Sequence, residues 1–287
     1  MLHFFLANLL FKNLFMKSSV FKRSVLCSES IILCLLFVFS FSLHAQRGNS
    51  NGNNRNNFKQ WSWEEVNNNA NWSPRAGLQV LNHQDQFFLF GGRTPLDPAL
   101  FPFPVPGASF IWGDAWKSED YGSSWDNILQ TDDSSHWPAR AYFQAVSKGD
   151  FMYIIGGQNF NIVENPGIPD LPPFFSKSDF FNDVWRSEDG ANWTNITENA
   201  GWSARAGLSA VVFNNEIYAS CRSNNGIKKA NLSNSNLTDF QLWSSITTGN
   251  FESVIVSASS IYAVNSSNTI FEINGITLNT LFNFSQP

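Results

Sequence analysis

The amino-acid sequence predicts an all-β protein built from a repeat of short strands, and two observations carry this prediction. First, a Trp-x-x-Arg motif recurs twice at an interval of 65 residues. It is found at Trp72–Arg75, Trp137–Arg140 and Trp202–Arg205. Second, no segment of the repeat shows the 3.6-residue apolar period of an amphipathic helix, so we expect little helix. A fixed period of this length is typical of repeat architectures.

Each repeat unit contains the pattern of four strands. After the arginine comes an alternating apolar stretch, then a polar turn, then an apolar run that ends in paired glycines. That second run is Phe87–Gly92 in the first unit and Met152–Gly157 in the second. Gly113–Ser118 and Asn182–Ser187 give a third strand, and a fourth begins at a tryptophan a turn later. Short aromatic and β-branched runs between turn residues are typical of strands.

The third unit departs from the pattern, because Cys221-Arg222 stands where the paired glycines should be. Apolar runs beyond it still predict strands. These runs are Phe240–Ile246, Ser253–Val256, Ile261–Val264, Thr269–Ile273 and Asn279–Phe284. The sequence therefore predicts about four units of four strands.

A strand without a unit of its own is expected at the front of the folded part. Trp63–Val66 fits the fourth-strand pattern, and Trp63 precedes Trp72 by the same nine residues that separate Trp193 from Trp202. We expect this segment to be an outer strand that completes the last sheet.

The repeat resembles the kelch-type β-propeller blade, as in the central domain of galactose oxidase. The resemblance rests on the arginine before the inner strand, the paired glycines, the aromatic residue of the third strand and the tryptophan that opens the fourth. It implies a β-propeller of four-stranded blades. About four blades are visible where kelch propellers usually have five to seven, so we expect a small or incomplete ring.

The turn between the third and fourth strands resembles the Asp-box of sialidase-like propellers. It reads Ser118-x-Asp120-x-Gly122-x-x-Trp125, and Ser187–Trp193 is a version one residue shorter. The aspartate would accept backbone N–H groups and the glycine would take a positive φ. The resemblance implies a structural role for this turn.

The N-terminal region predicts export. Basic residues precede the short apolar run Ile31–Phe41, and Ala45 follows it. This order is typical of a secretory signal peptide, and the run is short for a membrane span of about 20 residues. We expect residues 1–45 to be a signal peptide, with the start at Met16 as an alternative, 46–60 to be a flexible Asn/Gly-rich leader and 61–287 to fold. An uncleaved anchor is the other interpretation.

The exported part is acidic. Residues 1–45 carry four basic residues and one acidic residue, so their loss lowers the formal charge from −5 to −8. Acidity disfavours a nucleic-acid partner. Only Cys221 remains among the cysteines, so no internal disulfide is expected. The expected location is secreted, periplasmic or on the cell surface, with no membrane span after signal cleavage.

The three repeated arginines are the first candidate ligand site. Arg75, Arg140 and Arg205 stand just before the first strand of their units. In the kelch family this position can face the central channel and bind acidic ligands. The structural alternative is that the arginines pair with acids of the repeat such as Asp114 and Asp183.

Two insertions between the second and third strands are the other candidate site. Arg93–Trp112 and Gln158–Phe181 are rich in proline and phenylalanine. Long loops on a rigid scaffold often carry function, and exposed phenylalanine offers contact area. The candidate contact residues are Phe101, Phe103, Phe110, Phe174 and Phe175. The alternative is that the insertions fold over the propeller and bury their phenylalanines.

These patterns favour a non-catalytic binding module for a protein or glycan ligand. The rival is a glycan-processing enzyme like a sialidase or sialic-acid epimerase that uses the arginines, with Glu216 and Tyr218 as a weakly supported catalytic pair. A degenerate copy without a stable fold is a third hypothesis. His83, His136 and Cys221 do not match the copper site of a propeller oxidase, and no phosphate loop or zinc motif is present, so no catalytic residue, metal or cofactor is predicted.

Overall fold

The structure is a computed structural model that describes residues 63–100, 105, 107–131, 135–170, 172–221, 226–230, 243–257 and 259–284. The expected signal peptide and leader lie outside these ranges, as do Phe101 and Phe103. Apart from a 3-10 turn at Pro98–Leu100, the regular structure of the described residues is β-strand. The expected all-β class is confirmed.

The strands form four antiparallel sheets, each with its four strands in sequence order. Sheet 1 contains β1 (Gln79–His83), β2 (Gln86–Pro95), β3 (Ser109–Ser118) and β4 (Asp126–Leu129). Sheet 2 contains β5 (Gln144–Lys148), β6 (Phe151–Glu164), β7 (Phe174–Ser187) and β8 (Thr194–Thr197). Sheet 3 contains β9 (Ser209–Phe213), β10 (Glu216–Ser220), β11 (Ile227–Ala230) and β12 (Trp243–Thr247). Sheet 4 contains β13 (Phe251–Ser257), β14 (Ser260–Asn265), β15 (Thr269–Asn274) and β16 (Thr277–Asn283).

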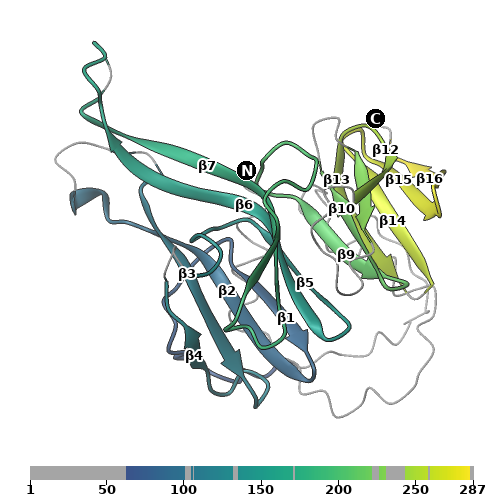
Figure 1. The fold of residues 1–287 in the computed structure, drawn as a ribbon, viewed down its shortest axis with the longest axis horizontal. Coiled ribbons are helices and arrows are strands. Elements are labelled where there is room, and N and C mark those ends of the chain that lie inside the picture. Colours follow the sequence, from purple (N-terminus) through teal and green to yellow (C-terminus); the bar gives the residue numbers. More distant parts are fainter. Residues whose placement is uncertain are drawn as a thin grey trace, which may run out of the picture.

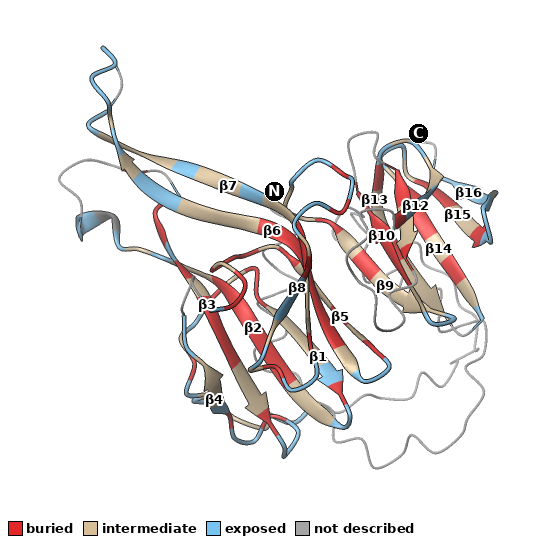
Figure 2. Ribbon diagram, in the orientation of Figure 1, coloured by how far each residue is buried: buried red, intermediate tan, exposed pale blue. Residues whose placement is uncertain are grey.

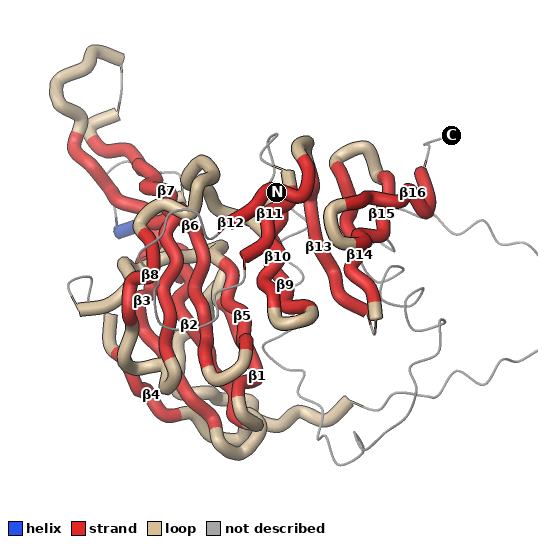
Figure 3. The backbone as a smooth tube through the Cα atoms, turned by 45° about the vertical axis from the view of Figure 1, so that its right-hand side comes forward, coloured by secondary structure: helices blue, strands red, loops and turns tan. Residues whose placement is uncertain are grey.

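The sheets follow one another in a row through their first strands. β1 packs against β5, β5 against β9 and β9 against β13. Sheets 1 and 4 stand at the two ends of this row (Figures 1 and 3). The described chain is therefore a propeller-like fold of four blades, arranged as an open arc.

Paired tryptophans hold the first three units together. The tryptophan of each Trp-x-x-Arg motif meets the tryptophan at or just before the fourth strand of the same sheet, edge to face. The pairs are Trp72–Trp125 at 6.2 Å, Trp137–Trp193 at 6.1 Å and Trp202–Trp243 at 4.8 Å between ring centroids. Such pairs contribute about 0.5–1.5 kcal/mol beyond their burial. The motif thus anchors the start of each unit to its outer strand.

The core lies between the sheets, because successive residues of a strand point to opposite faces. On β6, Met152 and Ile154 pack with Phe88 and Phe90 of sheet 1, while Tyr153 and Ile155 face sheet 3. Met152, Tyr153, Ile154 and Ile155 have no exposed surface. Figure 2 shows the same buried band in the middle strands. Burial on both faces explains why this run is apolar throughout.

The paired glycines mark a bulge at which the second and third strands change register. Gly156 and Gly157 have φ of +60° and +105°, and the β6–β7 register shifts between Ile155 and Gly157. A Cβ on Gly156 would lie 2.6 Å from Leu208 Cδ2 and 3.2 Å from the Arg205 carbonyl oxygen. Backbone conformation and close packing both require glycine here.

The turn before the fourth strand has the expected local structure. Asp120 Oδ1 accepts the Ser124 backbone N–H at 2.8 Å, and Gly122 has φ of +92°. In sheet 2, Asp189 Oδ1 accepts the N–H groups of Ala191 and Asn192 at 2.9 and 2.8 Å. These bonds satisfy backbone donors that the turn removes from the sheet.

The prediction of a ring-closing strand at Trp63–Val66 is wrong. This segment has no strand structure, and Trp63 is 61% exposed. Sheet 4 is instead completed by its own β16, which pairs with β15 across the turn at Gly275 and Ile276. A hairpin partner a few residues away has a smaller loop-closure cost than a strand some 200 residues distant.

The prediction that the two insertions are loops also needs correction. β2 and β3 continue as paired strands to Pro95↔Ser109, and β6 and β7 continue to Glu164↔Phe174. Much of the second insertion, and the two ends of the first, therefore form extended hairpins. Strand β11 was not predicted from the sequence, because it follows the point at which Cys221-Arg222 interrupts the repeat.

Candidate functional site

The longest extension of the fold is a two-stranded ribbon, which we define as Gln158–Glu164 of β6 and Phe174–Phe181 of β7. It projects well beyond the body of sheet 2 (Figure 1). Two-stranded hairpins alone are marginally stable in water. The ribbon is continuous with strands that are buried in the core, which fixes its direction.

One face of the ribbon carries the apolar side chains Phe160, Ile162, Phe174 and Phe180 among four polar ones, and we call it the apolar face. The register pairs Gln158 with Phe180, Phe160 with Ser178, Ile162 with Ser176 and Glu164 with Phe174, so these side chains share a face. Ile162 is 37% and Phe180 is 49% exposed. The opposite face carries the polar residues Asn159, Asn161, Lys177 and Asp179, together with Val163 and Phe175. Of the two predicted contact residues on β7, Phe174 thus belongs to the apolar face and Phe175 to the polar one.

The base of the ribbon rests on the insertion of sheet 1. The Arg93 guanidinium lies 4.7 Å from the centroid of the Phe160 ring and donates from Nη2 to the Gly107 carbonyl oxygen at 3.1 Å. Phe110, another predicted contact residue, is 44% exposed and packs on Trp112 at 4.5 Å. Arg93 was not predicted as a contact residue from the sequence. It could have been found because it departs from the repeat, in which Gln158 stands at the equivalent position.

Two of the three repeated arginines are buried in ion pairs within their own sheets. Arg75 binds both carboxylate oxygens of Asp114, at 2.6 and 3.1 Å, and Arg140 binds those of Asp183 at 2.7 and 2.8 Å. Both arginine side chains are 0% exposed. The pairing expected as the structural alternative is confirmed. The guanidinium groups also stack on Trp112 and Phe181.

The third arginine has a different environment. Arg205 donates to the carbonyl oxygen of Cys221, just as Arg140 donates to the carbonyl oxygen of Gly156. It also donates to the hydroxyl and carbonyl oxygens of Ser203. By strand register, Gly226 occupies the place of Asp183, so this position offers no carboxylate. The three arginines are therefore equivalent in the repeat but differ in their partners.

Glu216 and Tyr218 share a face of β10, as expected. The Tyr218 hydroxyl donates to Glu216 Oε2 at 3.0 Å, and Lys229 Nζ contacts the same oxygen at 3.0 Å. Burial, with the hydrogen bond and charge of Glu216, raises the pKa of Tyr218 to about 12. A tyrosine nucleophile needs the opposite shift.

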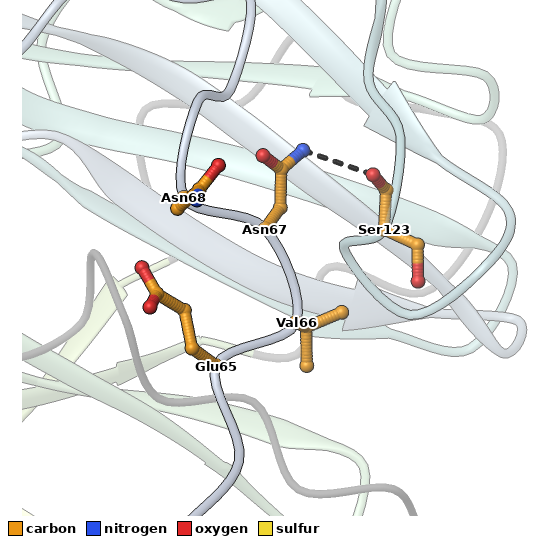
Figure 4. Close-up of a pocket in the computed structure, with 5 residues that line it drawn as sticks. All are labelled: Glu65, Val66, Asn67, Asn68 and Ser123. Atoms are coloured by element: carbon orange, nitrogen blue, oxygen red, sulfur yellow. Dashed lines mark hydrogen bonds between the residues drawn. The ribbon is translucent and has the colours of Figure 1, made fainter.

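A small hollow of about 330 Å³ opens beside the turn of sheet 1. Its lining residues are Glu65, Val66, Asn67, Asn68 and Ser123. Asn67 Nδ2 donates to the Ser123 carbonyl oxygen at 2.9 Å, and Glu65 extends away from that contact (Figure 4). The hollow is polar and lacks the apolar wall of an ordinary small-molecule site.

In the part of the chain that the structure describes, the other reactive side chains do not gather into a centre. Burial raises the pKa of the Cys221 thiol to about 12. Burial also lowers the pKa of His83, whose Nδ1 lies 2.8 Å from Ser147 Oγ. Among the described residues, no three His, Cys, Asp or Glu side chains form a metal-binding group. The described part of the chain also contains no helix that could span a membrane.

Comparison with known proteins supports the fold alone. No family model and no curated protein matches the sequence. Among solved structures, that of YjhT matches with a TM-score of 0.51 and 13% sequence identity. The match covers 78% of this chain and 69% of YjhT. At this identity the similarity extends to the arrangement of the sheets, and the chain has a propeller-like fold.

Proposed function

We propose that this protein is an exported, non-catalytic binding module of the kelch type, and that the apolar face of the ribbon contacts its protein or glycan ligand. The observation that carries the proposal is the exposure of Ile162 and Phe180 on one face of a projecting hairpin. Exposed apolar residues gathered on one face mark interaction sites more often than scattered ones. The signal-like N-terminal sequence supports export.

The neighbouring surface would enlarge the contact. Arg93 brings a positive charge and stacks on Phe160 at the base of the ribbon, and Phe110 adds an exposed ring on sheet 1. Aromatic rings and arginine are the side chains that dominate binding energy at protein interfaces. Rigid aromatic groups also lose little conformational entropy on binding.

A binding assay with paired variants tests the proposal. The full chain, exported and purified, would be probed with a glycan array and a random-peptide display library. We expect the double variant Ile162→Ser, Phe180→Ser to bind the selected ligand at least about tenfold more weakly, because two desolvated contacts are lost.

Leu281→Ser is the matched control, because Leu281 is 52% exposed on β16 and does not belong to the ribbon. We expect this variant to bind normally. If the ribbon variant binds the selected ligand as tightly as the wild-type protein does, the proposed site is wrong. Loss of binding with Leu281→Ser as well would indicate unspecific apolar adhesion.

A further inference from the structure

The ribbon of sheet 2 has an outer edge along β7. β8 pairs with β7 only at residues 184–186, in the body of the sheet. Further along β7, the Asn182 carbonyl oxygen accepts the Ala200 N–H at 2.8 Å. Within the ribbon, from residue 174 to residue 180, the strand-pairing partner of β7 among the described residues is β6 alone. In Figure 1 this edge lies on the side of the ribbon away from sheet 1.

The backbone groups that point to this edge follow from the register of the ribbon. In an antiparallel pair, residues whose N–H and C=O bond to the partner strand alternate with residues whose groups point away from it. The Asn165 N–H donates to the Pro173 carbonyl oxygen at 2.7 Å, next to the pair Glu164↔Phe174. Counting onward in steps of two, the residues of β7 that bond to β6 are Phe175, Lys177 and Asp179.

The other end of the ribbon gives the same assignment. Gln158 exchanges two backbone hydrogen bonds, of 2.9 and 3.0 Å, with Ala141, which lies outside the ribbon. The partner of Gln158 on β7 is Phe180, so the backbone groups of this pair point outward on both strands. The outer edge of β7 therefore presents the N–H and C=O groups of Ser178 and Phe180.

Two opposite charges flank Ser178 on the polar face of the ribbon. The side chains of Lys177 and Asp179 are 63% and 45% exposed, and Lys177 Nζ lies 3.6 Å from Asp179 Oδ1. Opposite charges that face each other across two strands stabilise their pairing, whereas like charges directly opposite each other destabilise it. The order Lys-Ser-Asp therefore limits the registers in which this edge can pair with another strand.

The edge is complementary to itself. A two-fold axis through Ser178, perpendicular to the ribbon, places a second β7 antiparallel to the first. The N–H and C=O of Ser178 in each copy then bond to those of Ser178 in the other, and Lys177 of each copy lies opposite Asp179 of the other. An axis through Lys177 or Asp179 would instead place like charges opposite each other. Hydrogen bonding and charge thus select the same register.

We infer that two copies of this chain pair along the outer edges of their ribbons, with β7 antiparallel to β7 about Ser178. The two ribbons form one four-stranded sheet in the order β6-β7-β7-β6. Main-chain hydrogen bonds supply the contact, as in other cases of strand addition, and the same edge is used by both copies of a symmetric dimer. The apolar faces of the two ribbons lie on the same side of this sheet, because the axis is perpendicular to it.

Solution mass and charge reversal test the inference. The full chain, exported and purified, is expected to sediment at twice the mass of one chain at micromolar concentration. Lys177→Glu and Asp179→Lys each place two pairs of like charges at the contact, and each is expected to raise the dissociation constant at least about tenfold. Glu119→Lys is the matched control and should keep the dimer, because the Glu119 side chain is 67% exposed in sheet 1, outside the ribbon. Circular dichroism verifies that each variant is folded.

Mixing the two charge variants distinguishes this register from other contacts. The Lys177→Glu copy presents two negative charges and the Asp179→Lys copy presents two positive charges, so every opposed pair in the mixed dimer is attractive. We expect the mixture to associate more tightly than either variant alone. The double variant Lys177→Glu, Asp179→Lys restores opposite charges within one chain and should dimerise as the wild-type protein does.

Ser178→Pro tests the main-chain contact separately. Proline removes the Ser178 N–H, which points to the outer edge and does not belong to the β6–β7 ladder. We expect a folded protein whose dimer is at least about tenfold weaker, because two central hydrogen bonds are lost. A monomeric wild-type protein, a dimer that survives the charge variants or Ser178→Pro, or a mixture without recovery would each overturn the inference.

Discussion

At the scale of single residues, the buried arginines show how a charge can be kept in a β-sheet core. Arg140 places its guanidinium between the two oxygens of Asp183, the Gly156 and Pro138 carbonyl oxygens and the Phe181 ring. Asp183 also accepts the Trp185 indole N–H at 2.7 Å. Each of these partners compensates part of the desolvation of the Arg140 charge. The ion pair contributes little net stability, but removing one partner strongly destabilises the fold, because the other charge is then buried alone.

We therefore predict that Asp183→Asn destabilises the protein by about 3–5 kcal/mol, because it leaves the Arg140 charge buried without a carboxylate. Urea unfolding monitored by tryptophan fluorescence measures this change. The control is Asp179→Asn, whose pair with Lys177 is exposed at 45% and 63% and should cost at most about 1 kcal/mol. Equal effects of the two substitutions would contradict the structural role of the buried pair.

The turn aspartate of sheet 2 predicts a pH dependence of stability. Partial burial alone would raise the pKa of Asp189, but hydrogen bonds from Asn192, Ala191 and Ser187 outweigh it and lower the pKa to about 2. A carboxyl group whose pKa is lower in the folded state stabilises the fold above its unfolded pKa of about 3.9 and loses this contribution as the pH falls.

We expect the stability difference between wild type and Asp189→Asn to be full at pH 6 and to shrink between about pH 4 and pH 2. Thermal melts of both proteins across this pH range measure the difference. A difference that stays constant down to pH 2 would show that the carboxylate charge does not stabilise the turn.

At the scale of elements, the bulge and the ribbon belong to one hairpin. Gly156 and Gly157 shift the register of β6 against β7, and beyond them the two strands continue outward as the ribbon. Below the bulge both faces are buried by neighbouring sheets. Beyond it, residues on both faces of the ribbon are exposed, such as the adjacent Asn161 and Ile162, because no sheet among the described residues covers them.

Two glycines with the same φ separate the roles of conformation and packing. Gly149 and Gly156 have φ of +59° and +60°, but a Cβ on Gly149 would meet no atom within 4 Å. We expect Gly149→Ala to cost about 1–2 kcal/mol from backbone strain. Gly156→Ala adds a clash with Leu208 and should cost about 1–3 kcal/mol more. Chemical denaturation of both variants measures the gap, and equal costs would contradict tight packing at the bulge.

At the scale of the whole molecule, stability depends on contacts between successive sheets. Each sheet packs on its neighbours in the row, as in repeat proteins whose stability is a sum of units and interfaces. Among the described residues, sheets 1 and 4 each pack on one neighbouring sheet, whereas sheets 2 and 3 pack on two.

Hydrogen exchange should therefore show an unequal distribution of protection. We expect amides of β14 in sheet 4 to exchange faster than the matching amides of β6 and β10, because local opening of an end sheet breaks one interface instead of two. Mass spectrometry of peptides from these strands measures the rates. Uniform protection across the sheets would indicate a single cooperative unit.

The sequence by itself determined the class and the period of this fold. The Trp-x-x-Arg motif and the Ser-Asp turns act largely through neighbours within one unit, so their local geometry could be predicted from their order. The pairing of Arg140 with Asp183 was foreseen as an alternative for the same reason. The paired glycines could be recognised from the repeat, but the packing of Gly156 on Leu208 of the next unit appears only in the structure. The signal peptide and the role of Phe101 and Phe103 stay predictions, as does the ligand-binding role of the arginines.

Only the tertiary structure decided which surfaces are open. The insertions looked like loops because alternation in Gln158–Glu164 is obscured by asparagine and phenylalanine, and pairing with β7 appears only in the register. Trp63–Val66 has the composition of an outer strand, yet a strand forms only where an edge is free, and β16 already occupies the edge of sheet 4.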